Sequence, residues 1–276
     1  MKRVIIAQGG GFRTAFTAGI IDCLLSKHHK PFDGFIGVSG GAIALSYYLS
    51  DQYGACIDAM KYLSQSDDFF QFRRLMSHKG YMDIEKLRMV ANEKVPFDLD
   101  HGLAEIKDKE VYFVSTDKVT GDPVYLRPEK EDWVDVVIAS CTLPFVTKGT
   151  HVVRGMKLMD GGWTDPIPVR WAIEQGAEEI LILRTTHISK LFSQSWPDYF
   201  GSKFYENDPA LHKIFSNNHQ IYNNTLSFLG NPPNGVKITQ IWPEEGLNCG
   251  TYGHSLKAVL ADYRYGVHAA QDYLSR

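Results

Sequence analysis

The first fifty residues alternate between short apolar runs and amphipathic stretches, with glycine at each junction. Residues 4–7 are apolar and mostly β-branched, and this run stops at three consecutive glycines, residues 9–11. Residues 14–25 then place apolar side chains at a helical period. A second apolar run, 35–38, stops at another glycine turn, which is followed by a helical stretch over 42–49. This order predicts parallel strands joined by right-handed helical crossovers, because both faces of such a sheet must be covered.

The alternation of strands and helices continues along the rest of the chain. Residues 55–110 are helix-biased and dotted with charges, with a turn predicted at Lys79-Gly80. The pattern predicts strands at 111–115, 123–126, 179–183 and 236–242 and helices at 133–139, 169–174 and 255–274. No repeat, low-complexity tract or linker divides the sequence. We therefore expect an α/β fold with a mainly parallel central sheet, in a single domain over residues 1–276.

The composition is that of a globular protein and excludes a disordered chain. Hydrophobic residues make up 44% and charged residues 22% of the 276 positions. The formal net charge is −3, so we expect no nucleic acid partner. No apolar run approaches the roughly 18 residues that span a bilayer, and the amino-terminal run is too short for a signal peptide. Four scattered cysteines without a CxxC pair are typical of buried free thiols, so we expect a cytoplasmic protein.

Residues 37–41 read Gly-Val-Ser-Gly-Gly and satisfy the pattern G-x-S-x-G. A strand is predicted before this motif and a helix after it, which is the context of a nucleophile elbow. There the serine occupies a strained turn, and small flanking residues let the backbone pass close by. The turn would project the hydroxyl of Ser39 into solvent at the start of a helix, whose amides favour negative charge. The alternative is a glycine-rich turn with no chemical role.

A second glycine turn, residues 9–11, also follows a predicted strand and opens a helix. One interpretation is a dinucleotide fingerprint, G-x-G-x-x-G, but Thr14 stands where its third glycine would be. The other interpretation is an oxyanion hole, because glycines can aim backbone amides at a developing alkoxide without a Cβ in the way. For that role we expect the amides of Gly10 and Gly11 as donors, with the amide of Gly40 as a further donor.

Ser39 needs a base that accepts its proton. A Ser-His-Asp triad would require a histidine late in the chain, and the candidates are His187 and His254, neither of which lies in a glycine turn. Asp160 is followed by two glycines just after a short apolar run. Such a turn can bring a carboxylate close to another loop, and the alternative is an aspartate in a type I′ hairpin turn. On the residues alone, both kinds of base stay open.

Four motifs together resemble the signatures of the patatin-like phospholipase family. They occur in the family's order, at residues 9–13, 37–41, 139–144 and 160–162. The third of them, Ala-Ser-Cys-Thr-Leu-Pro, is similar to the small-residue helix and proline loop that precede the family's aspartate. The resemblance covers about residues 4–185. We expect residues 186–276 to form a carboxy-terminal extension with an aromatic-rich segment and a closing helix.

The resemblance implies a fold, a reaction and a set of site residues. The fold is a three-layer α/β/α sandwich, and the enzyme is a carboxylic ester hydrolase that cleaves acyl esters of lipids through an acyl-enzyme. Ser39 and Asp160 would form a catalytic dyad. No metal or cofactor is implied, and the expected partner is a lipid or acyl ester, met in transient contact with a membrane surface. A His-triad α/β-hydrolase esterase and a non-hydrolytic nucleotide-binding or interaction protein are the alternatives.

The sequence departs from the family pattern at two positions. Thr14 stands where many members have glycine, and Ile167 precedes Pro168 where plant patatins carry asparagine. Both departures bear on loop geometry and substrate choice rather than on the dyad. Arg13 matches the basic residue that is common after the glycine loop. We expect it to bind substrate by attracting a lipid phosphate, or to pair with an acid and fix the loop.

Aromatic residues are concentrated in residues 191–229, where nine of the 39 positions are aromatic, about twice the chain average of 12%. Four of them would share one face of a helix by their spacing: Phe192, Trp196, Tyr199 and Phe200. One hypothesis is that this face packs on the sheet, and the other is that it lies over the active site and meets lipid. A rival candidate for lipid contact is the stretch 69–74, where phenylalanines adjoin two arginines.

Overall fold

The structure is a computed structural model that describes most of residues 1–276. Outside the described residues are positions 67–68, 70–81, 145, 148 and 195 and the side chains of Trp196 and Pro197. The turn predicted at Lys79-Gly80 and most of the stretch 69–74 therefore lie outside the described residues.

Eight strands form one sheet in the described part of the chain, in the order β5-β6-β3-β2-β1-β7-β8, with β4 paired to β3 off this path. Their bounds are β1 Arg3–Ala7, β2 Gly34–Val38, β3 Glu110–Asp117, β4 Pro123–Leu126, β5 His151–Val153, β6 Met156–Asp160, β7 Glu179–Leu183 and β8 Lys237–Ile241. The strands β1, β2, β3, β7 and β8 pair in parallel, whereas β4, β5 and β6 pair antiparallel. The expected mainly parallel sheet is confirmed.

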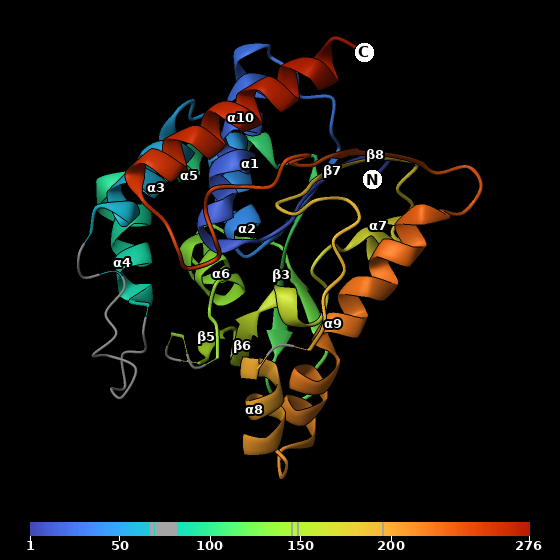
Figure 1. Ribbon diagram of the computed structural model, residues 1–276. Coiled ribbons are helices and arrows are strands. Elements are labelled where there is room, and N and C mark those ends of the chain that lie inside the picture. The colour runs from blue at the N-terminus through green and yellow to red at the C-terminus, as the bar shows by residue number, and fades with distance from the viewer. Residues whose placement is uncertain (67–68, 70–81, 145, 148, 195) are drawn as a thin grey trace.

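Side chains of the central strands alternate between two layers of helices. Ile5 and Ala7 point into the larger core, with α1, α2, α3, α6 and α10, whereas Val4 and Ile6 point to the opposite face, which α7 and α9 cover. Figure 1 shows these two helical layers on either side of the sheet. The three-layer α/β/α sandwich is therefore confirmed.

The helices are mostly short, apart from three long ones at the two ends of the chain. Their bounds are α1 Thr14–Ser26, α2 Gly40–Leu49, α3 Ala55–Ser64, α4 Ile84–Met89, α5 Leu99–Glu105, α6 Trp133–Ser140, α7 Val169–Glu174, α8 Trp196–Phe204, α9 Pro209–Gly230 and α10 Leu256–Leu274. A π-helical turn, Val90–Lys94, continues α4, and 3-10 turns cover Gly11–Arg13 and Gly161–Trp163. Among the described residues, none of the helices combines the length and the apolar character needed to cross a membrane.

The aromatic-rich segment differs from the expected single helical face. Phe192 lies outside α8, because Pro197 occupies the first turn of that helix, where proline starts a helix rather than continuing one. The Phe192 ring packs edge-on against Tyr222 instead, with the ring centres 4.6 Å apart. Tyr199 and Phe200 are 44% and 62% exposed, so the hypothesis that this face packs on the sheet is wrong for these two residues.

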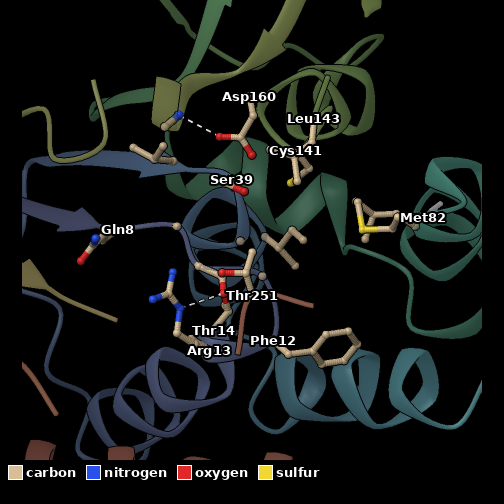
Figure 2. A pocket seen from close by; sticks show the side chains of 18 of the residues that line it. Gln8, Phe12, Arg13, Thr14, Ser39, Met82, Cys141, Leu143, Asp160 and Thr251 are labelled. Atoms are coloured by element: carbon tan, nitrogen blue, oxygen red, sulfur yellow. Dashed lines mark hydrogen bonds between the residues drawn. The ribbon is translucent and has the colours of Figure 1, made fainter. Parts of the chain in front are cut away.

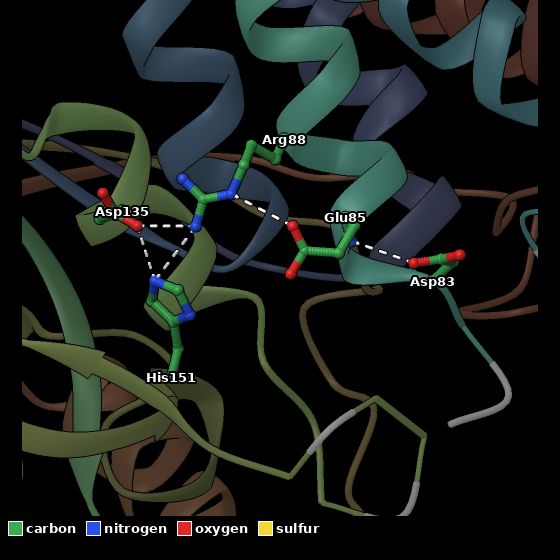
Figure 3. Close-up of polar contacts among 5 residues, drawn as sticks. All are labelled: Asp83, Glu85, Arg88, Asp135 and His151. Atoms are coloured by element: carbon green, nitrogen blue, oxygen red, sulfur yellow. Dashed lines mark hydrogen bonds and ion pairs between the residues drawn. The ribbon is translucent and has the colours of Figure 1, made fainter. Parts of the chain in front are cut away.

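An ion-pair network joins α4 to α6 and β5 (Figure 3). The Arg88 guanidinium donates to the Asp135 carboxylate at 2.7 Å and lies 3.4 Å from the Glu85 carboxylate. His151 Nε2 lies 2.8 Å from the same Asp135 oxygen. These contacts lower the pKa of Asp135 against the effect of its partial burial. Since the inner faces of α4 and α6 line the cavity described below, the network fixes the separation of two of its walls.

Candidate active site

Ser39 lies in the turn between β2 and α2, in backbone geometry that non-glycine residues rarely adopt. Its φ of 54° and ψ of −125° are strained, and such strain is concentrated at functional sites. Two flanking glycines are sterically required. A Cβ at Gly37 would lie 2.6 Å from the Cα of Ala42, and a Cβ at Gly41 would overlap the carbonyl oxygen of Ala7. The glycines of the G-x-S-x-G motif thus permit a sharp strand-to-helix turn with Ser39 at its tip.

Ser140, at the end of α6, holds this strained turn from outside. The backbone amide of Ser39 donates to the Ser140 hydroxyl oxygen at 2.8 Å, and the hydroxyl in turn donates to the Val114 carbonyl at 2.6 Å. Ser140 is fully buried. The sequence placed it in a family-like motif but gave it no role, because the only signal was a small polar residue in an apolar helix.

Asp160 is the last residue of β6 and begins the 3-10 turn that follows. Its carboxylate accepts a hydrogen bond from the Gly162 amide at 2.7 Å, and its backbone carbonyl accepts one from the Thr116 hydroxyl at 2.8 Å. The hairpin turn considered for this residue falls instead at Arg154, between β5 and β6. A Cβ at Gly161 would overlap the Val114 carbonyl, so close packing on β3 requires glycine there.

The hydroxyl of Ser39 and the carboxylate of Asp160 face each other across the cavity mouth (Figure 2). Asp160 is 4% exposed, and its burial raises the pKa of the carboxyl to about 6. The Ser39 hydroxyl and the Gly162 amide oppose this rise, because both donate hydrogen bonds that favour the charged form. Cys141 lies beside the pair, but burial keeps the pKa of its thiol well above the usual range. A neutral thiol is a poor nucleophile, so Ser39 is the better candidate nucleophile of the two.

The glycine loop after β1 approaches Ser39 from the neighbouring strand. A Cβ at Gly9 would lie 2.7 Å from the Cβ of Ser39, and Gly11 has a φ of 58°, a region that favours glycine. Within the described residues, the amides of Gly10, Gly11 and Gly40 donate no hydrogen bond. Three amides beside the serine are therefore available to a ligand. The Thr185 hydroxyl donates to the Gly9 carbonyl at 2.5 Å and holds the loop's first residue.

Arg13 is a largely buried cation at the end of this loop. Its Nε donates to the Gly10 carbonyl at 3.2 Å, and burial lowers the pKa of the guanidinium. No ion pair joins Arg13 to an acidic side chain of the described residues. The acid partner considered for Arg13 is therefore not found among the described residues, and the guanidinium contacts the loop's own backbone instead. Its guanidinium also lines the cavity and can meet an anion there.

The late histidines lie away from Ser39. The Nδ1 atom of His187 contacts the Ser189 hydroxyl at 2.8 Å, and neither His187 nor His254 lines the cavity. The His254 ring stacks on Phe12, with the ring centres 3.9 Å apart and the planes 12° apart. Among the contacts of the described residues, neither histidine is a hydrogen-bond partner of Ser39.

A cavity of about 430 Å³ extends from Ser39 into the larger core, a volume typical of small-molecule sites. Its deep part is apolar and is bounded by α2, α3, α4 with its π-helical turn, and α6. The lining side chains there include Met60, Leu63, Leu87, Val90, Val137 and Ile138. An apolar chain several carbons long would be sheltered from water in this part of the cavity.

The other side of the cavity is polar and comes mostly from the last third of the chain. Asn218, His219 and Tyr222 reach it from α9, and Tyr252 from the loop before α10. The Asn218 Oδ1 and His219 Nδ1 atoms are buried without a hydrogen-bond partner among the described residues. Sequence reasoning missed these residues, because a lone asparagine or histidine in a helix carries no local signal.

The amino-terminal part of the chain matches a family model described as patatin-like phospholipase over residues 5–173, more than half of the chain. The chain belongs to the patatin-like phospholipase family. The matched region contains Ser39, Asp160 and all three glycine amides described above. A patatin-like domain indicates lipid acyl hydrolase activity in general. Residues 208–276 match a second model, DUF6363, which is described as a domain of unknown function.

One sequence relative and one solved structure match nearly the whole length of this patatin-like protein. The uncharacterized protein YjjU of Escherichia coli (strain K12) is 27% identical over 267 residues, which cover 95% of this chain and 74% of YjjU. The crystal structure of VipD from Legionella pneumophila superposes with a TM-score of 0.49 at 12% identity, over 99% of this chain and 67% of VipD.

Metal ligation is not indicated in the described part of this patatin-like protein. No group of three or more His, Cys, Asp or Glu side chains gathers there in a way that could hold a metal ion. The groups around Ser39 are backbone amides, the Asp160 carboxylate, the Cys141 thiol and apolar side chains.

Proposed function

We propose that this protein is a serine lipid acyl hydrolase in which Ser39 is the nucleophile and Asp160 the base. The observation that carries the proposal is the buried Asp160 carboxylate facing the hydroxyl of Ser39 at the mouth of an apolar cavity. A carboxylate is ordinarily a weak base, and a pKa raised to about 6 by burial brings it closer to the operating pH of a general base.

The reaction follows from these groups in two steps. Asp160 accepts the Ser39 proton as Oγ attacks the ester carbonyl, and then returns the proton to the departing alcohol. The amides of Gly10, Gly11 and Gly40 donate to the oxyanion, where preorganised backbone donors have their largest effect. Water, activated by the same carboxylate, then attacks the acyl-enzyme and releases the fatty acid. The protein is on this proposal a carboxylic ester hydrolase that uses neither metal nor cofactor.

The substrate proposal follows from the two sides of the cavity. The apolar part near α3 and α4 accepts the acyl chain, because burying apolar surface there stabilises the complex by about 25 cal/mol per Å². Arg13 at the polar side binds the phosphate of a phospholipid, for which it has no competing acid among the described residues. The four buried free cysteines support a reducing, cytoplasmic location.

A lipid surface is the proposed source of the substrate. Tyr199, Phe200 and Phe204 on α8 are 44%, 62% and 75% exposed, which is unusual for large aromatic side chains gathered on one short helix. Exposed aromatic side chains strengthen transient binding to a membrane surface, because they insert between the lipid headgroups and the acyl chains. The helix packs beside α9, as Figure 1 shows.

The two alternative functions have less support. The two histidines considered for a triad, His187 and His254, do not line the cavity, and His219, which does, has no hydrogen bond to Ser39 among the described residues. A nucleotide-binding protein would use the glycine loop for pyrophosphate, but Thr14 stands where the third glycine of that fingerprint would be.

Labelling of the purified protein with a fluorophosphonate probe tests the proposal. We expect stoichiometric labelling that Ser39→Ala abolishes, because the probe reacts only with an activated serine. Asp160→Asn should reduce labelling and ester turnover at least ~10⁴-fold, whereas neither His187→Ala nor His254→Ala should approach that loss. Rapid turnover by a folded Asp160→Asn variant would exclude the dyad. A panel of lipid classes with the wild-type protein then identifies the headgroup.

A further inference from the structure

The loop between β8 and α10 contacts the glycine loop directly. The amide of Phe12 donates to the Thr251 carbonyl at 3.3 Å, and a Cβ at Gly11 would overlap that same carbonyl oxygen. One turn further on, the His254 ring stacks on the Phe12 ring. Two residues separated from the glycine loop by most of the chain thus cover it from outside.

Asp262, in α10, fixes the position of the loop that makes these contacts. Its fully buried carboxylate accepts hydrogen bonds from the backbone amide and side-chain amide of Asn248, at 2.9 and 2.8 Å, and from the amide of Cys249 at 2.8 Å. Gly250 and Gly253 then close a turn by a 2.7 Å hydrogen bond. A buried carboxylate with three donors holds such a loop more firmly than neutral acceptors would, since charge-assisted hydrogen bonds are roughly twice as strong.

The helix that carries Asp262 is itself packed tightly on the helix that follows the glycine loop. A Cβ at Gly266 would overlap the Phe16 carbonyl, and a Cβ at Gly19 would overlap the Tyr263 carbonyl, so α10 and α1 touch through their backbones. The contacts therefore run from the glycine loop through α1, α10 and Asp262 to Thr251, which contacts the glycine loop again. The position of the glycine loop thus depends on the packing of α10.

We propose that the carboxy-terminal segment, residues 208–276, holds the glycine loop in its active conformation, with Asp262 as the positioning residue. Three consecutive glycines lose much conformational entropy when ordered, so a loop of this composition needs external contacts to stay in one geometry. Backbone amides act on an oxyanion only when they are held in place before the reaction. The catalytic part of this inference rests on the proposed hydrolase function, whereas the mechanical coupling does not.

Asp262→Ala in the full chain tests the coupling, with Val259→Ala as the matched control. Val259 is also fully buried in α10, three residues earlier, and is not a hydrogen-bond partner of the 247–254 loop. We expect Asp262→Ala to speed hydrogen exchange of the hydrogen-bonded amides of Phe12, Arg13 and Thr14 at least about 10-fold. It should lower kcat on a soluble short-chain ester by about 10²-fold with a smaller change in KM. Asp262→Asn keeps one acceptor oxygen. It should therefore restore part of the amide protection and part of kcat.

Each outcome decides between the coupling and a merely structural role. Unchanged exchange of the amides of residues 12–14 in Asp262→Ala overturns the proposal. So does an increase that Val259→Ala matches at an equal loss of Tm. Should Asp262→Ala fail to fold, His254→Ala removes the stack on Phe12 and must itself speed exchange of the glycine loop. A wild-type protein that hydrolyses no ester, with faster loop exchange in the variants, refutes the hydrolase function and supports the coupling.

Discussion

Two glycine turns end neighbouring parallel strands of this protein, and they are stabilised in different ways. The strands β1 and β2 pair in register up to Ala7 and Gly37, and each then turns directly toward a helix. In the turn after β2, the glycines face close neighbours in the same core, Ala42 and Ala7. In the turn after β1, Gly11 faces Thr251, from the far end of the chain.

The two turns therefore hold the proposed nucleophile and most of the proposed oxyanion donors by different contacts. The turn around Ser39 is determined by local sterics and by one serine of α6, all within the family-matched region. Two of the amides proposed to stabilise the oxyanion, those of Gly10 and Gly11, lie in the loop that Thr251 contacts, and Thr251 belongs to a segment that the patatin-like family model does not include. One can therefore disturb the oxyanion loop through residues that never approach the substrate, while Ser39 and Asp160 keep their geometry.

The largest effect is expected at Gly11. Gly11→Val adds a side chain where the Thr251 carbonyl already lies, so the loop must move. Its backbone amides then no longer point toward the position of the oxyanion. We expect kcat to fall at least about 10²-fold, the usual cost of one lost oxyanion donor, with a smaller change in KM. Gly54→Val is the control, since Gly54 also has a positive φ but has open space around it. Equal losses in kcat for the two variants would attribute the effect to backbone strain alone.

A smaller effect is expected at Ser140, which acts on the other turn. Ser140→Ala removes the acceptor for the Ser39 amide and should lower kcat roughly 10-fold by loosening the strained turn. Thr142→Val serves as the control, because the Thr142 hydroxyl donates to the Ile138 carbonyl and does not contact Ser39. Steady-state kinetics of both variants at matched Tm give the comparison. A Ser140→Ala enzyme with wild-type kcat would mean that the glycines alone hold the turn.

The pH dependence of kcat/KM should report the pKa of Asp160, the proposed base. As the pKa of Asp160 is raised to about 6, kcat/KM should rise with pH through about 6 and then level off, because only the carboxylate accepts the proton. Asp165 is the control, since burial also raises its pKa to about 6 and its carboxylate bonds to Tyr125 away from the cavity. Asp165→Asn should therefore leave the activity profile in place. A profile that shifts in Asp165→Asn would contradict the assignment.

The same raised pKa has a consequence for stability. A folded-state pKa above the unfolded value of 3.8 means that the folded protein binds the Asp160 proton more tightly. The stability that this proton contributes is complete below pH 3.8 and is lost as the pH rises through about 6. At pH 8 the buried charge is therefore destabilising. We expect Asp160→Asn to raise Tm at pH 8 relative to the wild type, and to lose that advantage at pH 4.

The smallest effect on activity is expected from replacing the exposed aromatic side chains of α8. Phe200→Ser and Phe204→Ser remove exposed aromatic rings and should leave Tm and turnover of a soluble ester nearly unchanged. Activity on phospholipid vesicles should fall several-fold, because transient binding to the surface weakens. Phe215→Ala, in the buried contact of α9 with Trp163, is the control that lowers Tm and both activities together. Parallel losses on ester and vesicles for Phe200→Ser would contradict lipid contact.

Local patterns in the sequence predicted most of the sheet and the family-like motifs. The strand at 123–126 and the helix at 169–174 have the predicted bounds, because apolar periodicity and flanking glycine or proline act within a few residues. The short β5, by contrast, was not predicted. It is stabilised by pairing with β6 rather than by its own three residues.

The parts of the candidate site that were missed depend on distant contacts. Ser140 contacts Ser39 across 101 positions, and Thr251 reaches Gly11 only because α10 returns to α1. Asn218 and His219 enter the cavity through the length and direction of α9. None of these contacts leaves a periodicity or a local motif, so a single sequence carries no signal for them. The assignment of Ser39, Asp160 and Arg13 to catalysis and binding stays a prediction.

The contact between Gly11 and Thr251 can form only late in translation, because the two residues are far apart in the sequence. A ribosome adds about 5–20 residues per second, so roughly 10–50 s separate the appearance of these two residues. During that interval the nascent chain carries the serine turn and its carboxylate, but the glycine loop has no carboxy-terminal cover. Only when α10 emerges and packs on α1 does Thr251 cover the loop. On the proposed function, the nascent chain therefore hydrolyses esters more slowly until α10 has folded against α1.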